Sequence, residues 1–109
     1  METITIPSPL PIVIGRDQLA AICRRYGVRE LALFGSVLRN DFTADSDVDV
    51  LYELAPTSPV RSLFDLAALA TDLEDLFGRE VDLVNKHRIY PGLADTIGST
   101  RQVVYVATD

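Results

Sequence analysis

The residues of this sequence best suited to chemistry are two aspartates inside an otherwise apolar segment. Asp47 and Asp49 alternate with Val48 and Val50 in the segment 47–54. Successive side chains of a strand point to opposite faces, so this spacing predicts that both carboxylates share one face and both valines the other. Two carboxylates this close repel each other, so a positive partner is needed. An arginine could balance them, but Mg²⁺ binds carboxylate oxygens with better geometry.

A third carboxylate occurs in the same setting. Asp82 lies between Val81 and Leu83 in the apolar run 80–84. If the two flanking side chains face the core, Asp82 points to the opposite side. It then joins the first pair, provided that the two strands are neighbours. Three aspartates on one sheet face could hold two metal ions, which stabilise the attacking and leaving oxygens of a phosphoryl-type displacement.

A Gly-Ser pair upstream is a candidate phosphate site. Gly35 ends the predicted strand 30–34 and permits a tight turn or a close approach of the backbone. Ser36 precedes a predicted short helix, 37–40, whose free N–H groups favour an anion. The sequence contains no G-x-x-x-x-G-K-[ST] motif, which excludes a P-loop.

Each of these features is common when it occurs alone. A Gly-Ser pair is usually only a turn, and Asp-x-Asp is more often an exposed sheet edge than a metal site. The combination is more specific: a strand, Gly-Ser, ten residues, Asp-x-Asp on a second strand, a helix, and an aspartate on a third strand.

This combination resembles the minimal nucleotidyltransferases of the DNA polymerase β-like nucleotidyltransferase superfamily. The family pattern matches Gly35-Ser36, Asp47-Val48-Asp49 and Asp82, and the resemblance covers about residues 17–106. It implies transfer of a nucleoside monophosphate, AMP from ATP, with release of pyrophosphate.

The resemblance also implies a role for each matching residue. Asp47 and Asp49 would bind both Mg²⁺ ions, and Asp82 would hold the catalytic ion and favour deprotonation of the attacking hydroxyl. Gly35 and Ser36 would hold the triphosphate. Arg39 and Ser46 occupy positions where such proteins often carry Arg and Ser, and they are counted with the nucleotide-binding residues.

Many minimal nucleotidyltransferases are antitoxins paired with a HEPN-domain ribonuclease, and some AMPylate a tyrosine of that toxin. The resemblance therefore implies a HEPN-type toxin as partner. One alternative is an antitoxin that neutralises its partner by binding and occlusion. Another is a small-molecule transferase, although the chain leaves little room for a second domain to hold such an acceptor. The acceptor surface then comes from a partner protein or from a homo-oligomer.

Several further residues allow two interpretations. Arg39 either flanks the phosphate or forms a salt bridge with Asp41 or Asp45. Ser46 either orients its turn through backbone hydrogen bonds, which we favour, or acts in catalysis. His87, the single histidine, is a conceivable general base but more often such a loop histidine is exposed. The tyrosines are expected to pack rather than to stack on a base: Tyr26, Tyr52, Tyr90 and Tyr105.

Composition limits the class of protein. The chain has 109 residues and a formal net charge of −6, with nine arginines and a single lysine. This predicts one domain, 1–109, and argues against general nucleic-acid binding, which needs a positive field. No apolar run is long enough for a membrane span, no signal peptide is recognised, and the single cysteine, Cys23, forms no internal disulfide, so we expect a cytoplasmic protein.

The remaining pattern supplies the elements that must position the site. Residues 1–15 are expected to be extended because Pro7, Pro9 and Pro11 oppose a helix. Helices are predicted at 17–26, 60–77 and 88–97, and strands at 30–34, 47–54, 80–84 and 102–107. The predicted apolar stripe of the longest helix comprises Leu63, Leu66, Ala67, Ala70, Leu73 and Phe77. Strands that alternate with helices predict an α/β (α+β) fold, a small mixed sheet with helices packed on it. The resemblance specifies it as the polymerase β-like nucleotidyltransferase fold.

Overall fold

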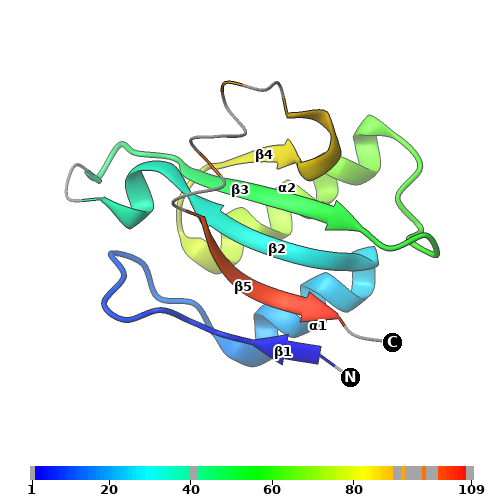
Figure 1. The fold of residues 1–109 in the computed structure, drawn as a ribbon, viewed down its shortest axis with the longest axis horizontal. Helices are drawn as coiled ribbons and strands as arrows, with labels where there is room; N and C mark the ends of the chain where they lie inside the picture. The colour runs from blue at the N-terminus through cyan, green and yellow to red at the C-terminus, as the bar shows by residue number, and fades with distance from the viewer. Residues whose placement is uncertain (1, 40–41, 90–91, 93–96, 98–100, 108–109) are drawn as a thin grey trace.

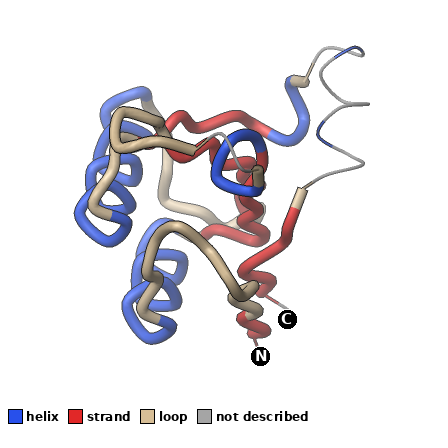
Figure 2. The backbone as a smooth tube through the Cα atoms, turned by 90° about the vertical axis from the view of Figure 1, so that its left-hand side faces the viewer, coloured by secondary structure: helices blue, strands red, loops and turns tan. Residues whose placement is uncertain are grey.

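Two α-helices cover one face of a five-stranded mixed sheet (Figure 1). The computed structural model describes residues 2–39, 42–89, 92, 97 and 101–107. Figure 2 shows both helices on the same side of the strands. The elements in chain order are β1 (Glu2–Ile4), α1 (Arg16–Tyr26), β2 (Val28–Phe34), the 3₁₀ helix η1 (Gly35–Leu38), β3 (Val48–Leu54), α2 (Leu63–Phe77), β4 (Val81–Asn85), the 3₁₀ helix η2 (Lys86–Arg88) and β5 (Gln102–Ala107). The predicted fold class is confirmed.

The strand order β1-β5-β2-β3-β4 places β3 between β2 and β4. The β3–β4 pair is parallel, and the other neighbouring pairs are antiparallel. Parallel strands need a crossover connection, and α2 supplies it. The two strands predicted to carry the aspartates are therefore direct neighbours.

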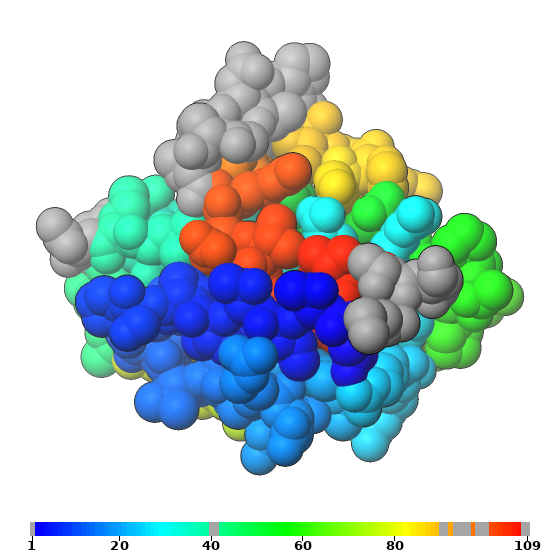
Figure 3. All heavy atoms as spheres, turned by 60° about the horizontal axis from the view of Figure 1, so that its bottom comes forward, coloured from blue at the N-terminus to red at the C-terminus, as the bar shows by residue number. Residues whose placement is uncertain are grey.

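Residues 2–15 contain no helix, and the first of them form a strand that the sequence did not indicate. Glu2 to Ile4 pair with Ala107 to Tyr105 of β5. Figure 3 shows this segment, in blue, lying along the red and orange β5. The tyrosine hydroxyl of Tyr105 donates to Glu2 Oε2 at 2.8 Å, and Arg24 of α1 also binds the Glu2 carboxylate. These bonds attach β1 to β5 and to α1.

The helices begin and end at residues with clear capping roles. Ser62 Oγ accepts a hydrogen bond from the backbone N–H of Asp65, which starts α2 at Leu63. The predicted start at residue 60 was therefore three residues early. The preceding Ser58 instead donates its hydroxyl to the carbonyl of Tyr26, at 2.6 Å. Gly27 and Gly78 end the two helices in the left-handed conformation.

The main core lies between the helices and the sheet. Val48, Val50 and Tyr52 of β3 all face it, as the alternation predicted. Tyr105 is buried as well, so these two tyrosines pack as expected, whereas Tyr90 lies outside the described residues. Among the described residues, no helix is long and apolar enough to cross a membrane.

The predicted apolar stripe of α2 was wrong at two positions. Leu63 is 82% exposed, and Ala67 is exposed as well. The buried side of α2 is centred on Leu69, Leu73 and Phe77. Each residue rotates a helix by about 100°, so Ala67 falls well to one side of that line.

A second, smaller cluster covers the middle of the other sheet face. It comprises Ala32, Phe34, Leu51 and Ile97. Leu51 shares the face of the aspartates, as predicted, but it is buried as a member of this cluster. Of the predicted helix 88–97, only residues 88, 89, 92 and 97 are described, and Arg88 is the last residue of η2.

Candidate active site

Asp49 is held by strands on both sides. It is paired with Phe34 of β2 and, in the parallel register, with Asp82 of β4. Asp49 and Asp82 are therefore directly opposite each other on neighbouring strands. Val81 and Leu83 pack against the main core, and Asp82 is exposed on the opposite face. The sheet thus brings two of the three predicted carboxylates together through the alternation read from the sequence.

Gly35 provides the space that the Asp49 side chain occupies. Its φ is +76°, a left-handed conformation that favours glycine. A methyl group at this position would overlap Oδ2 of Asp49. The glycine is therefore needed for both reasons foreseen from the sequence, the tight turn and the close approach. This contact joins the Gly-Ser turn to the central carboxylate.

The electrostatic surroundings of Asp49 are unfavourable to its negative charge. Partial burial is the main cause that raises the pKa of Asp49, and the charges of Asp82 and Asp47 raise it further. Arg39 opposes this rise, so its guanidinium acts on the same carboxylate. Asp47 and Asp82 are exposed, whereas Asp49 is half-buried. A cation bound beside these carboxylates would therefore stabilise the ionised form of Asp49.

The donor set of this cluster is made of carboxylate oxygens. Such hard ligands suit Mg²⁺ or a similar cation better than a soft metal. In the part of the chain that the structure describes, no three His, Cys, Asp or Glu side chains are gathered closely enough to form a complete metal centre. The fit to a hard cation therefore rests on the donor chemistry and on the raised pKa of Asp49.

The loop before Asp47 is closed by Ser46. Its Oγ accepts from the backbone N–H of Thr43 at 2.9 Å, and its own N–H donates to the Thr43 carbonyl at 3.1 Å. Ser46 therefore orients the turn, the favoured of its two interpretations.

The turn after β2 is a 3₁₀ helix, Gly35–Leu38, rather than a helix over 37–40. Ser36 thus lies inside its first turn. The nucleotide-binding roles of Gly35, Ser36, Arg39 and Ser46 remain predictions, as does the metal-binding role of the aspartates.

One residue close to this site was not foreseen. Arg79 Nη1 donates to the carbonyls of Thr43 and Ala44, at 2.8 and 3.0 Å. Its guanidinium lies over the ring of Phe42, 5.0 Å from the centroid. In the sequence, Arg79 follows only a helix-ending glycine, and no local pattern connects it with a loop 35 residues earlier.

A groove of about 350 Å³ opens beside this contact. It is lined by Ala44, Asp45, Ser46, Asp47, Gly78, Arg79 and Glu80. The groove therefore borders the first motif aspartate.

His87 lies away from the carboxylate cluster. Its Nε2 is 2.7 Å from Glu53 Oε2, and its side chain is 68% exposed. Glu53 follows Asp49 by four residues, a strand length of about 13 Å. The structure therefore gives His87 a hydrogen-bond partner, Glu53, rather than a place as general base beside the aspartates.

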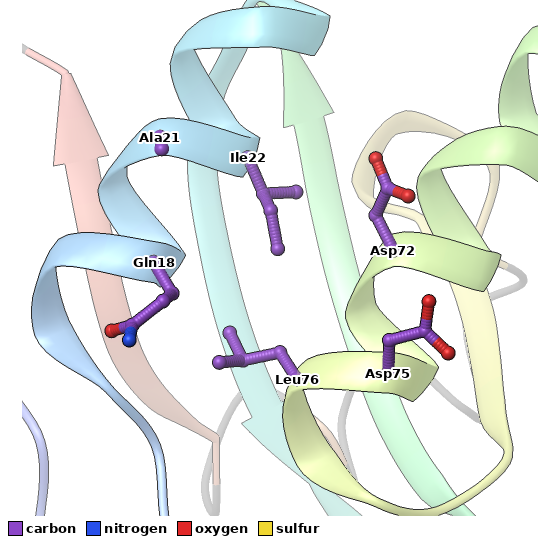
Figure 4. Close-up of a pocket in the computed structure, with 6 residues that line it drawn as sticks. All are labelled: Gln18, Ala21, Ile22, Asp72, Asp75 and Leu76. Atoms are coloured by element: carbon purple, nitrogen blue, oxygen red, sulfur yellow. The ribbon is translucent and has the colours of Figure 1, made fainter.

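A further groove of about 520 Å³ lies between the two helices (Figure 4). Its lining residues are Gln18, Ala21 and Ile22 of α1 with Asp72, Asp75 and Leu76 of α2. The helices and the aspartates occupy opposite faces of the sheet, so this groove is separate from the carboxylate cluster.

Comparison with known proteins agrees with the predicted fold and family. The model of the nucleotidyltransferase domain family matches residues 16–104. The chain is 43% identical over 82 residues to a protein adenylyltransferase, MntA, of Thermococcus cleftensis, covering 75% of this chain and 78% of that protein. It is 36% identical to a candidate protein adenylyltransferase of Methanocaldococcus jannaschii, covering 75% and 85%.

Solved structures share the architecture. A candidate minimal nucleotidyltransferase is 32% identical, with a TM-score of 0.64 and coverage of 80% of this chain and 86% of that one. A toxin–antitoxin structure with AMP-PNP has a TM-score of 0.67 at 18% identity, covering 87% and 76%. At that identity the likeness concerns the fold alone.

Proposed function

This chain belongs to the nucleotidyltransferase domain family, and we propose that it is an Mg²⁺-dependent protein adenylyltransferase that acts as an antitoxin. It transfers AMP from ATP to a hydroxyl of a partner protein, a tyrosine of a HEPN-type ribonuclease toxin. The observation that carries the proposal is the half-buried Asp49, set directly opposite Asp82 and against the backbone of Gly35.

The reaction requires charge stabilisation on both sides of one phosphorus atom. The acceptor oxygen forms a bond to the α-phosphorus of ATP, the bond from that phosphorus to the β-phosphate oxygen breaks, and pyrophosphate leaves. When bound to Asp47, Asp49 and Asp82, two Mg²⁺ ions would supply positive charge to the attacking and leaving oxygens. The exposed carboxylate of Asp82 favours loss of the acceptor proton. Asp49, on a strand with a neighbour on each side, holds a carboxylate at a fixed position between Asp47 and Asp82.

The nucleotide side is assigned to the turn after β2. Gly35 and Ser36 bind the triphosphate, and Arg39, whose charge already acts on Asp49, adds a cation close to it. Ser46 shapes the loop that leads into Asp47. ATP as the substrate is supported by the names of the adenylyltransferase relatives and by AMP-PNP in a structurally similar toxin–antitoxin structure.

A HEPN-type partner is supported by the structural neighbours. One of them is described as a tri-AMPylated HEPN toxin of Shewanella oneidensis in complex with an MNT antitoxin, with a TM-score of 0.59 at 18% identity. The net charge of −6 would also steer this chain towards a basic partner.

Label transfer tests the proposal. The chain is incubated with ATP labelled at the α-phosphate, Mg²⁺ and a HEPN protein encoded by a neighbouring gene. We expect label on that protein, and no label on a variant whose acceptor tyrosine is replaced by phenylalanine. Absence of transfer to any co-encoded partner in the presence of Mg²⁺ would contradict the proposal.

A second candidate function is neutralisation by binding alone, which the acidic charge of the chain would also favour. The two functions differ in their dependence on the aspartates. A double variant, Asp47→Ala with Asp49→Ala, would still protect cells from the toxin if occlusion is sufficient. Under the adenylyltransferase proposal, protection is lost although the complex still forms.

A further inference from the structure

We infer that Arg79 is a positioning residue that fixes the loop 42–46 and, through it, the carboxylate of Asp47. The inference rests on the proposed function, because it concerns the same aspartates. Asp47 precedes the first residue of β3, Val48, and it is absent from the paired positions of the sheet. Its position therefore depends on the residues on either side of it.

On the N-terminal side, Arg79 holds the loop. The two carbonyls that accept from Nη1 belong to consecutive residues, Thr43 and Ala44. The planar guanidinium also lies over the Phe42 ring. A single side chain thus contacts three consecutive residues of the loop. Arginine suits this combination because a fixed donor geometry and a stacking face occur in one group.

The loop transmits this restraint to Asp47 through a closed turn. Thr43 and Ser46 are joined by a backbone hydrogen bond and by the Ser46 hydroxyl. Ser46 is directly followed by Asp47 in the sequence. Fixing the carbonyl of Thr43 therefore fixes the residue that precedes the carboxylate.

On the C-terminal side of Asp47, the second restraint comes from Glu80, which follows Arg79 in the turn between α2 and β4. The backbone N–H of Val48 donates to the carbonyl of Glu80 at 2.8 Å. Asp47 is consequently flanked by two attachments, to Arg79 and to Glu80. The acceptors of Arg79 are neutral carbonyls, so these bonds use none of the carboxylate oxygens that line the adjoining groove.

The test compares three single variants. Arg79→Met removes the donors and keeps a stem of similar length, whereas Arg79→Lys keeps a donor and loses the planar face. Arg61→Met is the matched control, because Arg61 also donates Nη1 to a backbone carbonyl, that of Ser58 at 2.8 Å, at the start of α2. Circular dichroism and thermal melts establish that each variant is folded.

The first readout does not depend on activity. Amide hydrogen exchange is measured over residues 43–49 in the protein alone. In Arg79→Met, exchange in this loop is expected to rise about tenfold or more, since one anchor of the turn is lost. Arg79→Lys should be intermediate, and Arg61→Met should match the original protein. Unchanged loop exchange in Arg79→Met would overturn the inference.

The second readout separates positioning from general stability. Misplacement of a reacting group by about 1 Å can cost 10²-fold, so kcat for AMP transfer should fall by about tenfold to a hundredfold in Arg79→Met. KM for ATP should change less than about threefold, because the triphosphate is held by a different turn. Arg79→Lys should recover part of kcat. The inference would be overturned if KM for ATP rose by the same factor as kcat fell. It would also be overturned if the loop exchanged faster while kcat stayed normal.

The two readouts also distinguish failure of the inference from failure of the proposed function. If the original protein transfers no AMP to any partner, the proposed function is wrong. Loop exchange, together with titration of the protein with Mn²⁺, then still decides whether Arg79 fixes the carboxylate. A Mn²⁺ affinity about tenfold weaker in Arg79→Met would support the inference, and an unchanged affinity would overturn it.

Discussion

Each end of β3 carries a carboxylate on the same sheet face, Asp49 near the start and Glu53 near the end, but the two carboxylates have different electrostatic surroundings. Near the end of the strand, Glu53 has two favourable neighbours: the imidazole of His87, hydrogen-bonded at 2.7 Å, and the amine of Lys86 at 3.8 Å. Lys86 also lies 3.2 Å from Glu30. The hydrogen bond from His87 is the main cause that lowers the pKa of Glu53, and the charge of Lys86 adds to it.

At the start of the strand, the surroundings have the opposite effect. Asp49 faces two further carboxylates, Asp82 and Asp47, and its pKa is raised. The contrast separates a charge cluster that is balanced within the protein from one that is not. Around Glu53, side chains of the protein itself stabilise the negative charge, so no bound cation is needed. The cluster around Asp49 agrees with the active site that we propose, since a carboxylate whose pKa is raised by burial and by like charges is common at such sites.

The sharpest way to test this contrast is to remove one carboxylate at each end. Asp49→Ala is expected to lower AMP transfer by about 10³-fold or more, because charge stabilisation at the reacting phosphate is lost. Glu53→Ala is the matched control, on the same strand and face, and it should leave transfer within about threefold. Label transfer from ATP measures both. Equal losses in the two variants would remove the distinction between the ends.

A second test uses two glycines of similar conformation. Gly35 and Gly78 have φ of +76° and +71°, and a side chain at Gly78 would meet no atom within 4 Å. Alanine at either position should cost about 1–2 kcal/mol of unfolding free energy through the left-handed backbone. Only Gly35→Ala should displace the Asp49 carboxylate, so it should destabilise more and reduce transfer at least about tenfold. Chemical denaturation and label transfer separate the two effects. Normal transfer by a folded Gly35→Ala protein would contradict the role given to this contact.

The raised pKa of Asp49 predicts a specific dependence of stability on pH. The folded protein binds this proton more tightly than the unfolded chain, so Asp49 disfavours folding above its folded pKa, and the penalty is relieved as pH falls through that value. Asp49→Asn should therefore stabilise the metal-free protein at neutral pH, by about 0.5 kcal/mol after solvent screening. Thermal melts between acidic and neutral pH, with and without Mg²⁺, measure this. We expect Mg²⁺ to stabilise the original protein and not the variant; a variant less stable than the original at neutral pH would contradict the electrostatic account.

The smallest effect is expected at the balanced end. His87→Ala removes one partner of Glu53, but the side chain of His87 is 68% exposed, so the loss should stay below about 1 kcal/mol. The pKa of Glu53 is lowered in the folded protein, so its contribution to stability is present above the unfolded pKa and is lost as pH falls through the folded one. In His87→Ala this acid sensitivity should weaken, and AMP transfer should be unchanged. A large loss of transfer would instead return His87 to the list of catalytic candidates.

The parts of the fold that depend on local periodicity could be predicted from the sequence. Alternation over two residues was sufficient to place Val48 and Val50 in the core and Asp82 on the opposite face. The alternation of apolar and polar residues within one strand is sufficient to assign its two faces. A shift of the pairing by one residue would expose the apolar side chains, so the pattern also favours a single register. The predicted fold and family are confirmed for the same reason, since the motif spacing is itself a local property.

Features that depend on contacts between distant segments could not be predicted. The bond from Arg79 to Thr43 spans 36 residues, and β1 pairs with the last strand of the chain. The exposure of Leu63 depends on where α2 sits over the sheet, and the helix period alone does not determine this. These features follow from tertiary packing, for which a single sequence contains no short-range signal.

The strand order has a consequence for how the three aspartates can respond to a ligand. Asp49 belongs to an inner strand with a neighbour on each side, Asp82 belongs to β4 at the edge of the described sheet, and Asp47 precedes its strand. Backbone mobility should therefore be lower at Asp49 than at Asp82, whereas the contacts of Arg79 and Glu80 limit the mobility of Asp47. A ligand that requires a different spacing of the carboxylates should therefore shift Asp82 more than Asp49.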